Sequence, residues 1–144
     1  MFDCILYPTD FSDVSMKALD YVKQLKDAGA KEVIVLHVID ERTLVGTVQE
    51  VFIDFVAIEN ELRKIADEES NRIMAQLREK GLNAKFRIEK GIPFLEILKV
   101  AKEEDVSLIV IGSHGKSNVE EMLLGSVSEA VIRKAAQPVL VVKR

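Results

Sequence analysis

The chain has 144 residues, of which 48% are hydrophobic and 31% are charged, and its formal net charge is −4. This length and apolar content suit one globular domain, residues 1–144, with a complete hydrophobic core. The acidic balance argues against a nucleic-acid partner, and because no apolar run is long enough to cross a membrane and no signal peptide begins the chain, we expect a cytoplasmic protein.

The first predicted strand runs from Cys4 to Tyr7 and is aliphatic nearly throughout. A helix follows, with Ser12 as a plausible N-cap and Gly29 as its stop. Its apolar residues recur at helical spacing, and they are Val14, Ala18, Tyr21, Val22, Leu25 and Ala28. The second strand is predicted from Val33 to Ile39. The connection from Asp40 to Val51 fits no element, and connections of that length are usually mobile or functional.

A long helix is predicted from about Phe52 to Lys80, ended by Gly81. Its apolar face comprises Phe55, Ile58, Leu62, Ile65, Ile73 and Leu77. The third strand, Ala84 to Ile88, alternates charged and apolar residues, which is typical of an edge strand.

Pro93 fits the first turn of the next helix, and the fourth strand is predicted from Leu108 to Ile111. The last helix runs from about Ser126 to Ala136, and the last strand from Val139 to Val142. Aliphatic runs of this kind indicate strands buried on both faces. The alternation of strands and helices therefore predicts a doubly wound, five-stranded parallel sheet with helices on both faces.

Gly112, Gly115 and Gly125 lie between the fourth strand and the last helix, in the pattern G-x2-G-x9-G-S. Glycine lets a backbone approach a ligand and point N–H groups at an anion. The helix start at Gly125-Ser126 favours phosphate for the same reason. Lys116 would add a positive charge, and the hydroxyls available are those of Ser113, Ser117, Ser126 and Ser128. The alternative, that the glycines simply turn the chain, stays open, and neither a Walker A motif nor a dinucleotide fingerprint occurs.

Asp10 follows the first strand, at the end where open parallel sheets bind ligands. Its carboxylate could accept hydrogen bonds from ribose hydroxyls or hold a hydrated Mg²⁺. Equally, Asp10 could simply be an acidic residue at the start of the following helix. Asp40, after the second strand, is interpreted as a solvated loop residue. His37 is interpreted as a core or interface residue, and His114 as a loop or phosphate contact. The acidic stretches Glu103-Glu104-Asp105 and Glu120-Glu121 are interpreted as solvated surface.

These features resemble the universal stress protein family over nearly the whole chain. The matching segments are Ile5 to Ser12, Leu36 to Asp40, Gly91 to Pro93, Gly112 to Ser128 and Pro138 to Val142. The glycine pattern is the mark of the family's ATP-binding branch. The resemblance implies an adenine nucleotide alpha hydrolase-like fold with strand order 3-2-1-4-5.

The resemblance also implies how ATP would lie. Asp10 would face the ribose, and the backbone of Val38 would read the adenine edge. The nucleotide-binding residues implied are Pro8, Thr9, Asp10, Val38, Gly112, Ser113, His114, Gly115, Lys116, Ser117, Asn118, Gly125, Ser126, Val127 and Ser128. Mg²⁺ or Mn²⁺ would bridge the phosphates, and the family commonly forms homodimers through the final strand, here Val139 to Val142.

We therefore expect an ATP-binding protein that acts as a nucleotide-dependent stress-response or signalling module. One alternative is a slow ATPase or phosphotransferase with the same site. A second is a structural dimer with a vestigial nucleotide loop. Phosphoryl transfer needs a positioned nucleophile and charge stabilisation. Lys116 and His114 are the only candidates for these roles in the sequence. No catalytic residue is assigned, and binding is favoured over catalysis.

Overall fold

The computed structural model describes residues 1–44, 55–115 and 124–144. Within these ranges lies a five-stranded parallel sheet with the order β3-β2-β1-β4-β5. Its strands are β1 (Cys4–Pro8), β2 (Glu32–Asp40), β3 (Asn83–Gly91), β4 (Leu108–Gly112) and β5 (Val139–Val142). The expected strand order is confirmed, with β3 at one edge and β5 at the other.

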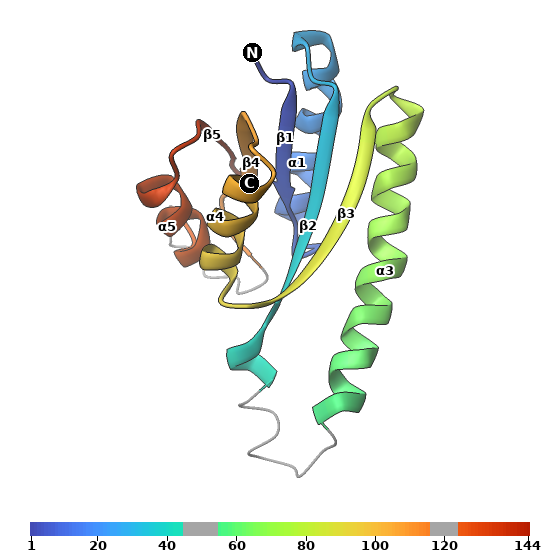
Figure 1. Cartoon of the computed structure of the whole chain (residues 1–144), viewed down its shortest axis with the longest axis vertical. Helices are drawn as coiled ribbons and strands as arrows, with labels where there is room; N and C mark the ends of the chain where they lie inside the picture. Colours follow the sequence, from blue (N-terminus) through green and yellow to red (C-terminus); the bar gives the residue numbers. More distant parts are fainter. Residues whose placement is uncertain (45–54, 116–123) are drawn as a thin grey trace.

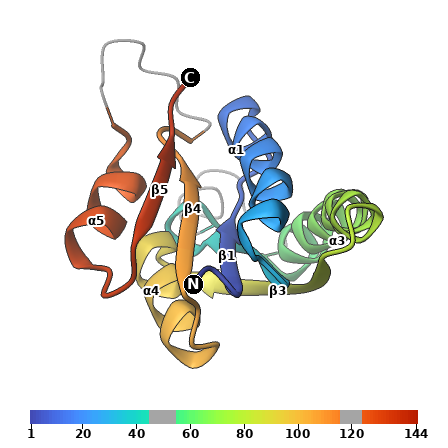
Figure 2. The same cartoon turned by 90° about the horizontal axis from the view of Figure 1, so that it is seen from above.

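Helices cover both faces of this sheet (Figure 1; Figure 2). One face carries α1 (Asp13–Gln24) and α3 (Phe55–Glu79), and the other carries α4 (Pro93–Glu103) and α5 (Ser126–Lys134). Because side chains alternate along a strand, Ile5 and Tyr7 of β1 enter the core under α1 and α3, whereas Leu6 enters the core under α4 and α5. No helix among the described residues is both long and apolar enough to span a membrane.

The helix boundaries follow the predicted signals. The hydroxyl of Ser12 accepts a hydrogen bond from the backbone N–H of Ser15 and caps α1. A short 3-10 turn, η1 (Leu25–Ala28), extends this helix to Gly29, whose φ of 102° suits glycine. Pro93 occupies the first turn of α4. Residues 41–44, at the start of the predicted irregular connection, are helical, and residues 45–54 lie outside the described ranges.

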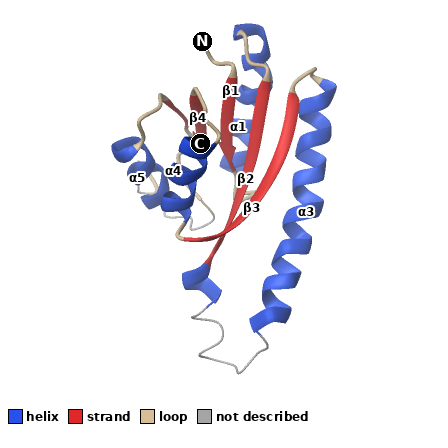
Figure 3. Cartoon of the chain, viewed as in Figure 1, coloured by secondary structure: helices blue, strands red, loops and turns tan. Residues whose placement is uncertain are grey.

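The predicted apolar face of the long helix is partly wrong. Leu62 and Ile65 are 37% and 46% exposed. The buried residues of α3 lie further along the helix and are Ala66, Ser70, Ile73, Met74 and Leu77. Figures 1 and 3 show the reason, because β3 curves away from the first turns of α3 and leaves them beyond the sheet.

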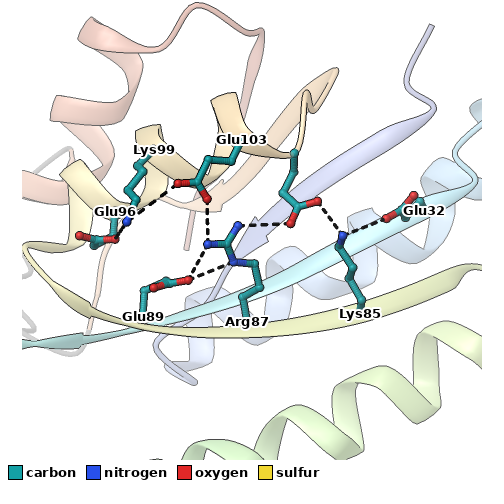
Figure 4. Close-up of polar contacts among 8 residues, drawn as sticks. Glu32, Lys85, Arg87, Glu89, Glu96, Lys99 and Glu103 are labelled. Atoms are coloured by element: carbon teal, nitrogen blue, oxygen red, sulfur yellow. Dashed lines mark hydrogen bonds and ion pairs between the residues drawn. The ribbon is translucent and has the colours of Figure 1, made fainter.

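The interpretation of Glu103 and Glu104 as simply solvated is also wrong. Arg87 on β3 contacts Glu103 at 2.9 Å, Glu104 at 3.2 Å and Glu89 at 2.6 Å (Figure 4). Lys85 contacts Glu104 at 2.6 Å, and its hydrogen bond lowers the pKa of the Glu104 carboxyl. These ion pairs join the edge strand β3 to the end of α4.

Candidate functional site

A cavity of ≈ 500 Å³ opens at the carboxyl ends of β1, β2 and β4. Strand order reverses between β1 and β4, and open α/β sheets bind ligands in the crevice at this point. The cavity is within the size range of roughly 300–1,000 Å³ that is typical of small-molecule sites. The sheet topology therefore places a ligand-sized space where the sequence predicts one.

Most of the predicted site residues line this cavity. They are Pro8, Thr9, Asp10, Val38, Gly112, His114, Gly115, Gly125, Ser126, Val127 and Ser128. Ser113 is fully buried, does not line the cavity, and places its hydroxyl 2.7 Å from Nδ1 of His114. The remaining predicted residues, Lys116, Ser117 and Asn118, lie outside the described residues.

The start of α5 is the part of the cavity best suited to an anion. The first N–H groups of a helix have no partner within it, and the N-cap here, Gly125, has no side chain with which to cap them. The helix dipole adds partial positive charge at the same place. Ser126 is exposed, whereas the buried hydroxyl of Ser128 donates to the carbonyl of Gly112 at 2.7 Å. The hydroxyl of Ser128 thus ties α5 to β4.

Gly112 and Gly125 each make room for atoms of the protein itself. A Cβ on Gly112 would lie 3.0 Å from Cγ1 of Val14 and 3.2 Å from the backbone nitrogen of Ser15. A Cβ on Gly125 would lie 3.3 Å from the carbonyl oxygen of Ser113. Neither glycine has a positive φ. Their absent side chains let the starts of α1 and α5 pack closely around the cavity.

Gly115 lies next to the carboxylate of Asp10, and both residues line the cavity. A Cβ on Gly115 would lie 2.8 Å from Oδ2 of Asp10. The other carboxylate oxygen, Oδ1, accepts a hydrogen bond from the N–H of Ser12 at 3.0 Å. Asp10 is therefore an acid at a helix start that also lines the cavity, and its role toward a ribose or Mg²⁺ stays a prediction.

The turn that carries Asp10 is tied to α1 by buried hydroxyls. Oγ1 of Thr9 accepts hydrogen bonds from the hydroxyl of Ser15 at 2.6 Å and from the N–H of Phe11 at 3.0 Å. The fully buried hydroxyl of Tyr7 donates to the carbonyl of Ser15 at 2.6 Å. Burial raises the pKa of Tyr7, so its hydroxyl stays protonated and remains a donor at neutral pH.

The cavity lining includes apolar residues that the sequence did not indicate. These residues are Leu36, Pro93, Ile97 and Ile111. They come from β2, α4 and β4 and provide a surface for the flat face of an organic ring. In the sequence they look like ordinary core and helix-start residues, and only the register of the strands brings them to one end of the sheet.

Arg42 is a further lining residue that the sequence did not indicate. Its guanidinium donates to Asp40 through Nε at 3.0 Å and through Nη2 at 2.9 Å. These hydrogen bonds lower the pKa of the Asp40 carboxyl. Oδ1 of Asp40 also accepts from the backbone N–H of Arg42 at 3.0 Å. Asp40 is partly exposed, as expected, but it is also held by Arg42 and lines the cavity.

Among the described residues, no group of three or more His, Cys, Asp or Glu side chains is placed to hold a metal ion. Mg²⁺ is usually held by one or two carboxylates together with phosphate oxygens and water. Asp10 supplies a carboxylate of this kind that lines the cavity. The described residues therefore fit an ion that a bound phosphate group would bring with it.

Comparison with known proteins agrees with this geometry. The sequence profile of the universal stress protein family matches residues 1–143. Universal stress protein MJ0577 of Methanocaldococcus jannaschii is 45% identical over 158 residues, which span 100% of this chain and 96% of that protein. Universal stress protein YxiE of Bacillus subtilis is 40% identical over 150 residues, which span 99% of this chain and 100% of that protein.

Solved structures share the fold. A structure of MJ0577 gives a TM-score of 0.91 at 47% identity and covers 100% of this chain and 97% of its own. A universal stress protein in complex with cAMP gives 0.64 at 22% identity, with coverages of 99% and 97%. The Archaeoglobus fulgidus protein in complex with dAMP gives 0.66 at 24% identity, with coverages of 99% and 98%. The family profile and the full-length relatives together show that this chain belongs to the universal stress protein family.

Proposed function

We propose that this chain is a single universal stress protein domain that binds ATP and acts as a nucleotide-dependent stress-response or signalling module in the cytoplasm. The observation that carries the proposal is the set of groups that line one cavity. The cavity is lined by a helix start suited to an anion at Ser126, by the carboxylate residue Asp10 and by apolar residues such as Ile97. A nucleotide carries the three matching kinds of group, which are phosphate, ribose hydroxyls and a flat base.

In this proposal the phosphates lie against the N–H groups of Ser126 and Val127 and the loop Gly112 to Asn118. Asp10 accepts hydrogen bonds from the ribose, and the backbone of Val38 reads the adenine edge. Mg²⁺ or Mn²⁺ bridges the phosphates. Support for an adenine nucleotide comes from the two proteins of the same fold whose structures contain cAMP and dAMP.

A slow ATPase or phosphotransferase is the alternative use of the same site. The carboxylates among the described lining residues are Asp10 and Asp40. Asp40 is engaged with Arg42, and Asp10 accepts from the N–H of Ser12. Efficient phosphoryl transfer requires a group that orients the attacking oxygen. Because both carboxylates already accept hydrogen bonds from nearby backbone N–H groups, we rank ligand binding above catalysis.

A homodimer formed through β5 belongs to the same proposal. β5 is an edge strand, and its residues Val139, Leu140 and Val141 are only partly buried. An exposed aliphatic edge favours pairing with another strand. Pairing two copies of β5 across a twofold axis would cover both edges at once. A structural dimer that does not bind nucleotide is the third candidate, and the ATP titration below separates it from the first.

Titration of ATP and Mg²⁺ into nucleotide-free protein, followed by calorimetry, tests the proposed site. Ser126→Asp places a carboxylate at the first position of α5, where the helix dipole favours it, so the fold is expected to persist. The carboxylate repels phosphate by about 1–3 kcal/mol per charge at a separation of about 5 Å. The dissociation constant should therefore rise roughly 5- to 150-fold.

Leu95→Asp is the matched control. Leu95 lies in the first turn of α4, is 47% exposed and does not line the cavity. The substitution adds the same charge to another helix start, and the affinity should stay within about twofold of wild type. Equal affinities of wild type and Ser126→Asp would refute the placement of the phosphates. Absence of ATP binding to the wild-type chain would refute the function.

A further inference from the structure

The turn after β1 contains a strained residue. Phe11 has a φ of 65°, the left-handed conformation that side chains with a Cβ disfavour. Such a conformation persists only where surrounding groups hold it, and it is concentrated at functional sites. Phe11 directly follows Asp10, so the groups that hold Phe11 also fix the direction of the Asp10 carboxylate.

His37 on β2 contacts this turn on both sides of Asp10. Nδ1 of His37 lies 2.8 Å from the carbonyl oxygen of Thr9. Because a carbonyl only accepts, Nδ1 carries the proton and donates it. The imidazole ring also stacks on the ring of Phe11, with centroids 4.6 Å apart and planes 23° apart. One side chain from a neighbouring strand thus holds the residue before Asp10 and the residue after it.

Hydrogen bonds within the turn depend on the same geometry. The N–H of Phe11 donates to Oγ1 of Thr9 at 3.0 Å, and the N–H of Ser12 donates to Oδ1 of Asp10 at 3.0 Å. The second bond spans the backbone of Phe11 and so requires its left-handed conformation. If the turn relaxes, the carboxylate of Asp10 loses its backbone donor and its position against Gly115.

We propose that His37 is a positioning residue of the nucleotide site, which holds the turn from Thr9 to Phe11 so that the carboxylate of Asp10 faces Gly115 and the cavity. His37 is not among the residues that line the cavity, so it acts on a ligand through Asp10. The inference rests on the proposed function, since the group that Asp10 meets is the ribose of the nucleotide. It replaces the interpretation of His37 as a plain core or interface residue.

Two substitutions test this role. His37→Leu removes both the donor and the aromatic ring. His37→Asn loses the ring but keeps an amide donor at the place of Nδ1. If His37→Leu leaves the turn correctly formed about a tenth of the time, the apparent dissociation constant for ATP rises about tenfold. His37→Asn should recover most of that loss.

Amide hydrogen exchange in the ligand-free protein gives a readout that does not depend on nucleotide. The N–H groups of Phe11 and Ser12, which are bonded within the turn, should exchange at least roughly tenfold faster in His37→Leu, because the fraction of molecules with an open turn rises to about nine-tenths. In His37→Asn their exchange should return toward the wild-type rate. Two-dimensional spectra of ¹⁵N-labelled protein resolve both groups.

Ser107→Ala is the matched control for lost stability. Oγ of Ser107 accepts from the N–H of Cys4 at 3.1 Å and donates to its carbonyl at 2.9 Å. Cys4 is the first residue of β1, so Ser107 bonds the same strand as the turn does, at its opposite end. Loss of the Ser107 hydroxyl should lower the melting temperature, as we also expect of His37→Leu. It should not change the affinity for ATP or the amide exchange of the turn.

The outcomes separate this role from the proposed function. Wild-type exchange at Phe11 and Ser12 in His37→Leu would overturn the positioning role, whether or not ATP binds. Faster exchange with unchanged ATP affinity would overturn it as well, because the turn would then not matter to the ligand. Failure of the wild-type chain to bind ATP would overturn the proposed function, while the exchange data would still decide what holds the turn.

Discussion

The contacts of Gly112 predict that its replacement by alanine lowers stability rather than directly blocking a ligand. The new Cβ would lie 3.2 Å from two backbone atoms, the nitrogen of Ser15 and the carbonyl carbon of Val14, and 3.0 Å from Cγ1 of Val14. Backbone atoms at the start of a helix cannot rotate aside, so α1 and β4 must move apart. Overpacking of this kind costs about 1–3 kcal/mol.

A smaller effect opposes this cost. Gly112 has no positive φ, so alanine fits its backbone conformation and stabilises by about 0.4–1 kcal/mol through the unfolded state. The clash is the larger effect, and Gly112→Ala should lose about 1–2 kcal/mol of unfolding free energy. For a chain of this length the melting temperature should fall by roughly 3–8 °C. Urea unfolding followed by circular dichroism measures the difference.

Gly115→Ala is the informative comparison. Its Cβ would meet only the side chain of Asp10 closely, with Oδ2 at 2.8 Å, and a side chain can rotate away. Gly115→Ala should therefore change stability by less than about 0.5 kcal/mol, while ATP affinity falls because Asp10 is displaced. A Gly112→Ala variant that is as stable as wild type yet binds no ATP would refute the reasoning, since that glycine would then serve the ligand.

Three further predictions concern pH, assembly and turnover. The folded-state pKa of Glu104 is lowered by the hydrogen bond from Lys85, so its contribution to stability is present above the unfolded value of about 4.3 and is lost as pH falls through the folded value. The difference in unfolding free energy between wild type and Glu104→Gln should therefore shrink below about pH 4, and a constant difference down to pH 3 would contradict it. Light scattering at micromolar concentration should give the mass of a dimer, and a monomer with and without ATP would contradict pairing through β5. Steady-state hydrolysis of ATP should stay below about 1 s⁻¹, and faster turnover that Asp10→Ala abolishes would show an enzyme.

The strands and their order could be predicted because both follow from local patterns. Continuous aliphatic runs such as Val33 to Ile39 indicate strands buried on both faces, and the alternation with helices restricts the topology. The position of β3 at an edge was visible in the alternation of Lys85 and Arg87 with apolar residues. The buried face of α3 was less predictable, because periodicity reveals a helix but not how far the sheet beneath it extends. Ile65 is apolar and correctly spaced, yet it lies beyond the sheet.

The location of the cavity was predictable, and its lining was less so. The glycine spacing led to the end of the sheet where the cavity lies, but the atoms that Gly112 and Gly125 accommodate belong to the protein, which no spacing reveals. Arg42 and Ile97 line the cavity because strand register and helix packing bring them there. His37 was visible only as a polar residue inside an aliphatic strand. Its partners, Thr9 and Phe11, are far away in the sequence, so its contacts could not be predicted without the fold.

Binding of ATP between the start of α5 and the turn after β1 is tested most directly by ¹⁵N–¹H spectra of the native chain titrated with ATP and Mg²⁺. The N–H signals of Ser126, Val127 and Val38 should shift together and saturate at one ATP per chain. Spectra that do not change at millimolar ATP, or shifts confined to the opposite end of the sheet around Cys4 and Ser107, would contradict the proposed site.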